Sequence, residues 1–277
     1  MIKVEKRFDN VPTILNKDNR KEAFDKNIEK EGYVDSKNLY KVGSVQKVLN
    51  NLYHLKCAYC ERKLLDSPKH IEHYRPKDIY YWLAYSWDNL LLCCGSCNSA
   101  KGKRFATLNS KVEYDSESFK NIHGLGKSYD RIEKPLFENI HGLGKSYDEV
   151  EKPLIVNPEQ DDVFKLITFD VDGKIDSTND RVHHTIYKAC NLNREELIKL
   201  RLEIINDFKN SLEEHFSLFL LHKDITRFQP DIKLFKEKCK VEEEFYAFRY
   251  FIVNNVECFF EDNRPLQKIV KILMEKI

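Results

Sequence analysis

The sequence predicts a mostly α-helical protein with a small α+β core and a C-terminal helical domain. Two C-x-x-C motifs stand 33 residues apart in the first half of the chain, and this spacer is long enough for a hairpin and the start of a helix. In the last third, apolar residues recur at intervals of three and four, the spacing of amphipathic helices. The 277 residues are 42% hydrophobic, so the chain can bury a substantial core as one large domain or two ordinary ones.

Charge and hydropathy exclude several classes of protein. The 46 Lys and Arg nearly balance the 45 Asp and Glu, so any nucleic-acid surface must be local. No run of about 18 apolar residues is present, which excludes a membrane span and a membrane partner. The first residues lack the apolar core of a secretory signal, so we expect a cytoplasmic protein. In that compartment eight cysteines favour metal ligands or free thiols over a disulfide scaffold.

Residues 1–56 are expected to form an N-terminal helical segment. The polar stretch 18–31 has a short helical pattern, and a second helix is expected from Ser44, which we interpret as its N-cap. The apolar residues of this second helix are Val45, Val48, Leu49 and Leu52. This helix would lead the chain into the first C-x-x-C motif.

The cysteine spacing predicts a structural zinc site. Four thiolates from paired C-x-x-C motifs can close a tetrahedral site, whereas chance, a redox motif or simple buried thiols explain the pairing less well. The expected ligands are Cys57, Cys60, Cys94 and Cys97. Cys93 falls outside the spacing and is interpreted as a small buried hydrophobe. Core packing is expected for the three isolated cysteines, Cys190, Cys239 and Cys258.

Residues 57–110 contain a group of side chains suited to phosphodiester hydrolysis. That reaction needs a base for water, a hard divalent cation and positive charges that hold the backbone. His73 can act as the base, and Glu72 and Asn98 offer oxygen ligands for magnesium or manganese. Asn89 could orient His73 by bonding nearby backbone.

Basic residues around this group are candidates for phosphate contacts. Segment 57–105 has eight Lys and Arg against five Asp and Glu, an excess that permits a nucleic-acid footprint without requiring one. The candidates are Arg75, Lys77, Lys101, Lys103 and Arg104. Taken singly, each site residue could also have a structural role, as a surface residue, a helix cap or a turn residue. His70 could be a surface residue, a substrate contact or an accessory ligand. Their joint spacing between the cysteine pairs favours the catalytic interpretation.

The residues quoted above resemble a known family. The runs CAYCE, IEHYRPK and WDNLLLCCGSCNSAKGKRF are similar to the HNH endonucleases, specifically the PtuB subunit of the Septu anti-phage system and related retron-associated HNH proteins. The strong match covers about 57–105, with weaker likeness at the start of the chain, in 151–158 and in 189–201. The resemblance implies a ββα-metal HNH fold stapled by a four-cysteine zinc site, with a second divalent ion for the chemistry.

Position by position, the resemblance assigns catalytic roles to four residues. His73 matches the general base, Glu72 the adjacent acidic ligand, Asn89 the middle asparagine and Asn98 the last motif residue. Glu72 stands where Asp is more frequent, and its extra methylene could change the metal preference. Asn98 stands in place of the last histidine. The resemblance also implies a partner, an ABC- or SMC-like ATPase of the PtuA type.

Residues 111–158 are expected to form a polar connector built on a tandem duplication. Segment 119–136 recurs as 137–154 with 15 of 18 positions identical, which indicates a slipped duplication in a tolerant loop. The embedded HGLGKS lacks the glycine that a phosphate loop needs five residues before Gly-Lys, so that interpretation is rejected. His123 and His141 are expected to be loop residues.

Residues 159–277 are expected to form a hairpin and a helical domain that is the candidate partner-binding part. Alternation over 166–175 with Asp172-Gly173 predicts the hairpin, and Asn193 with Glu196 predicts a capping box that opens a long helix. An apolar pattern from Phe245 to Phe259 and Pro265 at a helix start predict the last helices.

The leading functional hypothesis is a metal-dependent endonuclease that acts as the effector of an anti-phage system, with DNA favoured as substrate. One alternative is an RNA- or tRNA-cleaving retron toxin. Others are a non-catalytic zinc module that binds nucleic acid or protein, and a thiol–disulfide protein, which the paired motifs disfavour.

Overall fold

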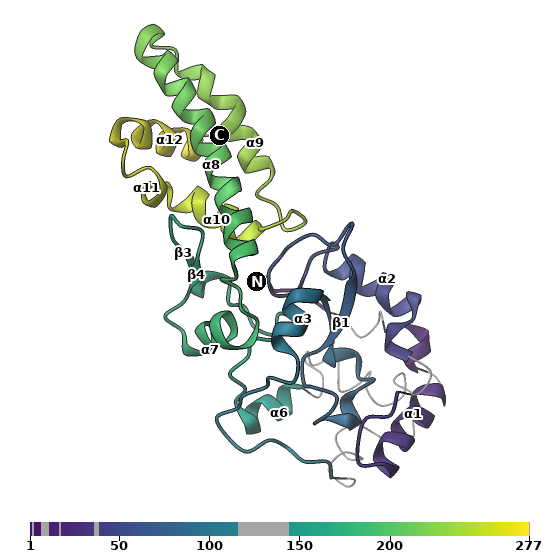
Figure 1. Ribbon diagram of the computed structural model, residues 1–277. Helices are drawn as coiled ribbons and strands as arrows, with labels where there is room; N and C mark the ends of the chain where they lie inside the picture. Colours follow the sequence, from purple (N-terminus) through teal and green to yellow (C-terminus); the bar gives the residue numbers. More distant parts are fainter. Residues whose placement is uncertain (2, 7–10, 17, 36–38, 116–143, 277) are drawn as a thin grey trace.

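The structure, a computed structural model, describes every residue except 2, 7–10, 17, 36–38, 116–143 and 277. A body formed by the N-terminal part of the chain carries an arm, in which a long helix, α8, extends away from the body beside α9 (Figure 1). Helices α10, α11 and α12 lie along the flank of α8. This arrangement confirms a mostly helical chain with small two-stranded sheets.

The centre of the body is a hairpin followed at once by a helix. Strand β1 (Lys69–His73) pairs antiparallel with β2 (Leu90–Cys94), with His70 opposite Cys93 and His73 opposite Leu90. All five residues of β2 are buried, as expected for a continuous apolar run. Helix α3 (Gly95–Lys101) follows directly and packs on both strands. The expected ββα unit is therefore confirmed.

The N-terminal segment packs against this unit. It contains η2 (Thr13–Asn16), α1 (Asp18–Glu29), η3 (Leu39–Lys41) and α2 (Gly43–Leu52). Helix α2 buries Val45 and Leu49 and contacts β2. The N-cap prediction was wrong, because the helix begins at Gly43 with Val42 in extended geometry before it, so Ser44 lies inside the first turn.

The chain between the two strands makes two short turns, η4 (Tyr81–Leu83) and η5 (Trp87–Asn89). Trp82 and Trp87 are both buried and belong to the core. Lys6 lies over the Trp87 ring at 4.0 Å and forms a buried ion pair with Glu159, which ties the start of the chain to the body.

The connector is more ordered than a tolerant loop where the structure describes it. Its end forms α6 (Gly144–Glu151), which comes from the second copy of the duplication, and Pro153 bridges to Thr107. The first copy at 119–136, and with it His123, lies outside the described residues, as does His141.

The hairpin predicted at 166–175 is present, with β3 (Thr168–Phe169) pairing antiparallel with β4 (Ile175–Asp176). It follows η6 (Phe164–Leu166) and precedes α7 (Asp180–His184), which continues into a π turn, η7 (Thr185–Ala189). Gly173 turns the hairpin with a φ of 73°, a conformation that L side chains rarely adopt.

The arm begins with α8 (Glu195–His222), as the apolar spacing predicts. The predicted capping box was wrong, because Asn193 instead bonds both backbone groups of Ile175 and Arg194 occupies the N-cap. The remaining elements are η8 (Ile225–Phe228), α9 (Gln229–Glu237), α10 (Tyr246–Asn254), α11 (Val256–Phe259) and α12 (Arg264–Lys276). The Phe245–Phe259 pattern is thus two helices, broken at Asn255.

Aromatic side chains hold the arm together, with Phe208 of α8 stacked on Phe235 of α9 at 4.1 Å. Of the isolated cysteines, Cys190 is buried as predicted, Cys239 is half-buried and Cys258 is exposed, so core packing was wrong for Cys258. Within the described ranges, no helix combines the length and apolar character needed to cross a membrane.

Candidate active site and zinc centre

Four cysteine sulfurs converge at the junction of β2 and α3. The Sγ atoms of Cys57, Cys60, Cys94 and Cys97 all lie within 4.8 Å of one another, and all four residues are buried. The Cys60 and Cys94 sulfurs are 3.8 Å apart, which matches the edge of about 3.8 Å in a zinc tetrahedron with Zn–S bonds of about 2.3 Å. The cluster therefore suits a structural zinc ion, as the spacing predicted.

The thiolate cluster is also contacted from the arm. Arg194, the residue before α8, donates to Cys97 Sγ at 3.3 Å and approaches Cys94 Sγ at 3.8 Å and Cys60 Sγ at 3.9 Å. A guanidinium at this place offsets the negative charge of four thiolates and joins the arm to the body. Cys93 is fully buried with its Sγ 3.6 Å from Cys57 Sγ.

An open hollow of about 530 Å³ lies beside β1 and the outer side of α3, and we call it the β1–α3 hollow. Three of the four predicted catalytic residues line it, namely Glu72 and His73 from β1 and Asn98 from α3. Lys77 and Lys103 also line it. The structure therefore brings together an imidazole, two oxygen donors and lysine ammonium groups from separate elements.

His73 is held as a neutral imidazole. Its Nε2 lies 2.9 Å from the Ala84 carbonyl oxygen, and because a carbonyl can only accept, Nε2 carries the proton and Nδ1 is left as an acceptor. Tyr40 packs edge-on against the ring at 4.7 Å. Burial lowers the pKa of His73 to about 3, so the ring is uncharged at neutral pH.

Asn89 does not line the hollow but fixes the backbone around His73. Its Oδ1 accepts from the Arg75 amide at 2.7 Å, and its Nδ2 donates to the carbonyls of Arg75 at 3.0 Å and Leu83 at 3.1 Å. It thereby joins the loop after β1 to the turn that carries Ala84, the partner of His73. Asn89 therefore bonds backbone near His73, and its role in orienting the ring stays a prediction.

Glu72 is bound on one side by a buried lysine. Lys101 Nζ lies 2.6 Å from Glu72 Oε1 and 2.6 Å from the His73 carbonyl oxygen, and its side chain is completely buried. Burial raises the pKa of Glu72, and the Lys101 charge opposes that rise. Lys101, expected to contact phosphate, is instead placed as an internal counter-ion.

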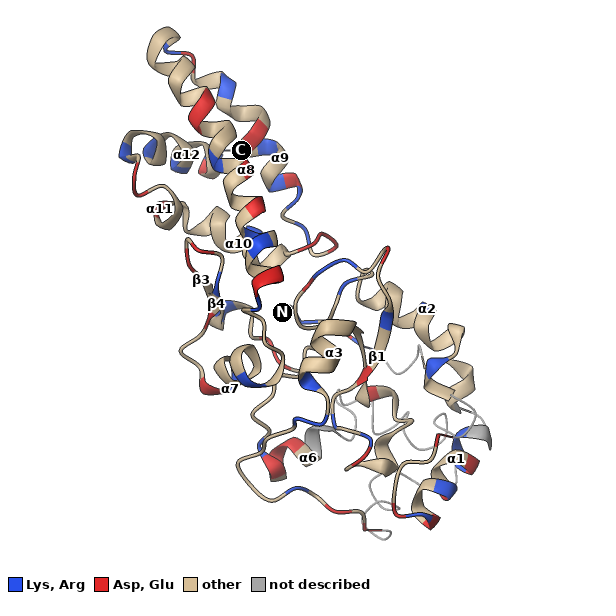
Figure 2. Ribbon diagram, viewed as in Figure 1, with Lys and Arg blue, Asp and Glu red and all other residues tan. Residues whose placement is uncertain are grey.

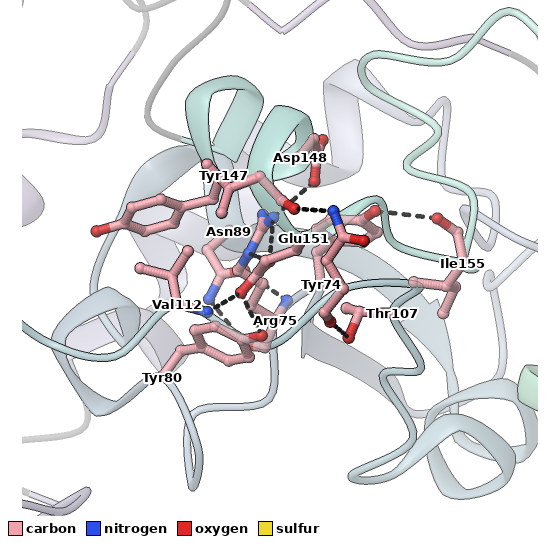
Figure 3. A network of polar contacts seen from close by, with 12 residues as sticks. Tyr74, Arg75, Tyr80, Asn89, Thr107, Val112, Tyr147, Asp148, Glu151 and Ile155 are labelled. Atoms are coloured by element: carbon pink, nitrogen blue, oxygen red, sulfur yellow. Dashed lines mark hydrogen bonds and ion pairs between the residues drawn. The ribbon is translucent and has the colours of Figure 1, made fainter.

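Arg75 departs from its expected role in the same way (Figure 3). Its guanidinium is 2% exposed and pairs with Glu151 at 2.9 Å and Asp148 at 2.6 Å. Glu151 is fully buried, and its other oxygen accepts from the Tyr80 hydroxyl and the Val112 amide. Both carboxylates belong to α6, so Arg75 anchors the second copy of the duplication and cannot also reach a phosphate.

The other predicted phosphate contacts lie at or near the surface. Lys77 donates to the Tyr40 hydroxyl at 2.7 Å, exposed Lys103 pairs with Asp78, and exposed Arg104 donates to the Ala100 carbonyl. The sequence reasoning missed Tyr40, Lys41, Gln46 and Lys69, which also line the hollow. The alternation of β1 could have pointed to Lys69, whereas no local signal marked the three residues of the N-terminal segment.

Away from the hollow, charged residues of both signs are spread over the body and the arm (Figure 2).

Comparison with known proteins identifies the class of this site. Residues 57–104 match the HNH endonuclease family model, a segment that contains the ββα unit, all four cysteines and the predicted catalytic residues. The chain therefore contains an HNH endonuclease domain and is a nuclease by class.

Similarity to particular proteins extends beyond that domain. Septu protein PtuB of Bacillus mycoides (strain KBAB4) is 27% identical over 246 residues, which cover 83% of this chain and 73% of that protein. Septu protein PtuB of Bacillus thuringiensis is 37% identical over 81 residues, 27% of this chain and 32% of that protein. Septu protein PtuA of B. mycoides is 22% identical over 179 residues, 60% of this chain and 21% of that protein.

Proposed function

We propose that this chain is a metal-dependent endonuclease that hydrolyses phosphodiester bonds, with DNA as the favoured substrate. The observation that carries the proposal is the convergence of Glu72, His73 and Asn98 on one open hollow with lysines at its edge. A non-catalytic zinc module would not require a neutral, carbonyl-anchored histidine beside spare oxygen donors. The HNH class of residues 57–104 supports the same conclusion.

His73 is assigned to proton transfer, and Asn89 positions it. His73 accepts the proton of the attacking water at Nδ1, because its Nε2 is committed to the Ala84 carbonyl. Burial makes this imidazole a weak base in the free protein, and the negative charge of an entering phosphate favours its protonated form. Asn89 keeps the ring in place through the backbone of Arg75 and Leu83.

Lysines at the edge of the hollow bind the phosphate backbone. Lys77 and Lys103 are the predicted contacts that face the hollow, and Lys41 and Lys69 add positive charge from the N-terminal segment and β1. Arg104 lies just beyond them on the surface.

Glu72 and Asn98 provide oxygen donors that suit magnesium or manganese. When bound, the divalent cation supplies Lewis-acid stabilisation of the charge that develops on the phosphate and on the leaving 3′-oxygen. The expected products carry 5′-phosphates.

We further propose that the enzyme is the effector subunit of a Septu-type anti-phage system in the cytoplasm, with an ATPase of the PtuA type as partner. The support is the similarity to two proteins named Septu protein PtuB, one of them matched over most of this chain. The arm within 159–277 is the candidate partner-binding part, since it extends from the body (Figure 1). The end of α8 and the start of η8 also expose apolar side chains. Those side chains are Leu218, Leu220, Leu221 and Ile225.

A cleavage assay tests the nuclease proposal. The chain, alone and with its partner ATPase, is incubated with plasmid DNA, single-stranded DNA and tRNA in magnesium or manganese, and the product ends are mapped. Metal-dependent cuts in DNA with 5′-phosphate ends are expected. Cleavage of tRNA alone would replace DNA by RNA as the substrate, and binding without cleavage under every condition would reduce the chain to a zinc module.

A further inference from the structure

We propose that His70 is a third protein ligand, beside Glu72 and Asn98, for the divalent cation of the β1–α3 hollow. This inference rests on the proposed function, because it concerns the same metal site. It adds a nitrogen donor to a site that otherwise offers only oxygen.

The hairpin register places His70 beside Glu72. The two residues are two positions apart on β1, so their side chains point to the same face of the strand. That face meets α3, since Lys101 of α3 contacts Glu72. All three proposed ligands line the same hollow.

The start of α3 is shaped to accept the His70 ring. A Cβ atom built on Gly95 would lie 3.3 Å from His70 Nε2, so the ring rests directly on the first residue of the helix. Asn98 is three residues further along α3 and therefore falls on the same side of the helix as Gly95. The imidazole, the carboxylate and the amide thus line one hollow from two elements.

Each of the three side chains retains an unused donor atom. Glu72 uses Oε1 for Lys101, and among the described residues no contact takes up its Oε2. Within the same part of the chain, neither the His70 ring nor the Asn98 side-chain amide has a hydrogen-bond partner. Three side chains that line one hollow can therefore each offer an atom to a cation.

The local charge explains why a neutral ligand is useful here. Lys101 neutralises Glu72, and Lys69, Lys77 and Lys103 also line or approach the hollow, so the site offers a cation little net negative charge. An imidazole adds a donor atom without adding a carboxylate, and it suits manganese and later first-row metals better than magnesium. The site should therefore prefer Mn²⁺ over Mg²⁺.

The test is electron spin-echo spectroscopy of the full-length, zinc-loaded protein titrated with Mn²⁺ in a nitrogen-free buffer. Zinc is silent in this measurement, and a coordinated imidazole gives ¹⁴N modulation. Wild type is expected to show this modulation. His70→Ala should lose it and bind Mn²⁺ at least about tenfold more weakly, whereas His73→Ala and the exposed-site control His183→Ala should keep it.

The outcomes separate this inference from the proposed function. Modulation that is missing in wild type, or that persists in His70→Ala, overturns the ligand assignment even if the protein cleaves DNA. If the modulation depends on His70 but the protein cleaves no substrate, the ligand assignment holds and the nuclease proposal is overturned. His70→Gln, with zinc content and circular dichroism measured, replaces the alanine variant if that variant does not fold.

Discussion

The Arg75–Glu151 pair should be one of the most sensitive points of the body. Glu151 accepts from Arg75 Nε at 3.1 Å, from Arg75 Nη2 at 2.9 Å, from Tyr80 at 2.7 Å and from the Val112 amide at 2.8 Å. In Glu151→Ala the buried guanidinium keeps only Asp148. Breaking a buried ion pair lowers the free energy of unfolding by about 3–5 kcal/mol. Because Asp148 still pairs with Arg75, we expect a loss near the lower end, about 3 kcal/mol.

Tryptophan fluorescence during urea unfolding measures this loss in the body alone, because both tryptophans, Trp82 and Trp87, lie between β1 and β2. Glu149→Ala is the matched control, since it removes the same charge from an exposed position of the same helix. Both variants are also made in a chain without residues 119–136, because that copy carries an equivalent glutamate, Glu133. Equal stability of Glu151→Ala and Glu149→Ala in the shortened chain would refute the reasoning.

Two further variants probe buried polar networks of the body. Asn89→Ala leaves three backbone groups unpaired, so we expect the free energy of unfolding to fall by about 3 kcal/mol. We also expect kcat to fall with little change in KM. An unchanged kcat would show that Asn89 does not position His73. Glu159 is buried beside Lys6 and Tyr53, and burial raises its pKa to about 7. The folded-state pKa lies above the unfolded value of 4.5, so the protonated carboxyl favours folding at low pH. This contribution to the free energy of unfolding is about 3 kcal/mol. It is lost as pH rises through about 7. Unfolding free energies at pH 5 and pH 8 should therefore differ by clearly less in Glu159→Gln than in wild type, and an equal difference would contradict the assignment.

Local patterns were enough to predict the centre of the body. The cysteine spacing determined which sulfurs meet, because two C-x-x-C motifs and one metal leave little freedom in geometry. The 33-residue spacer between the cysteine pairs predicted a hairpin and the start of a helix, which the structure contains. Glu72, His73 and Asn98, chosen for their joint spacing, line one hollow, and their catalytic roles stay a prediction.

Long-range partners could not be predicted from the same patterns. Arg75 and Lys101 look like surface charges in the sequence, and only the folded chain supplies Glu151 for one and Glu72 for the other. Ser44 and Asn193 are good cap residues by type, yet α2 begins one residue before Ser44, and Asn193 bonds the Ile175 backbone instead of capping α8. Tyr40 and Gln46 enter the hollow because the N-terminal segment packs there, a contact that no local signal encodes.

The most direct test of the account is the single-turnover rate of DNA cleavage by His73→Ala, measured together with its zinc content. The rate is expected to fall by about 10²–10⁴-fold, while zinc content and the circular dichroism spectrum match those of wild type. A variant that still cleaves at the wild-type rate, or that loses zinc and folded structure along with activity, would show that His73 is not the base of this site.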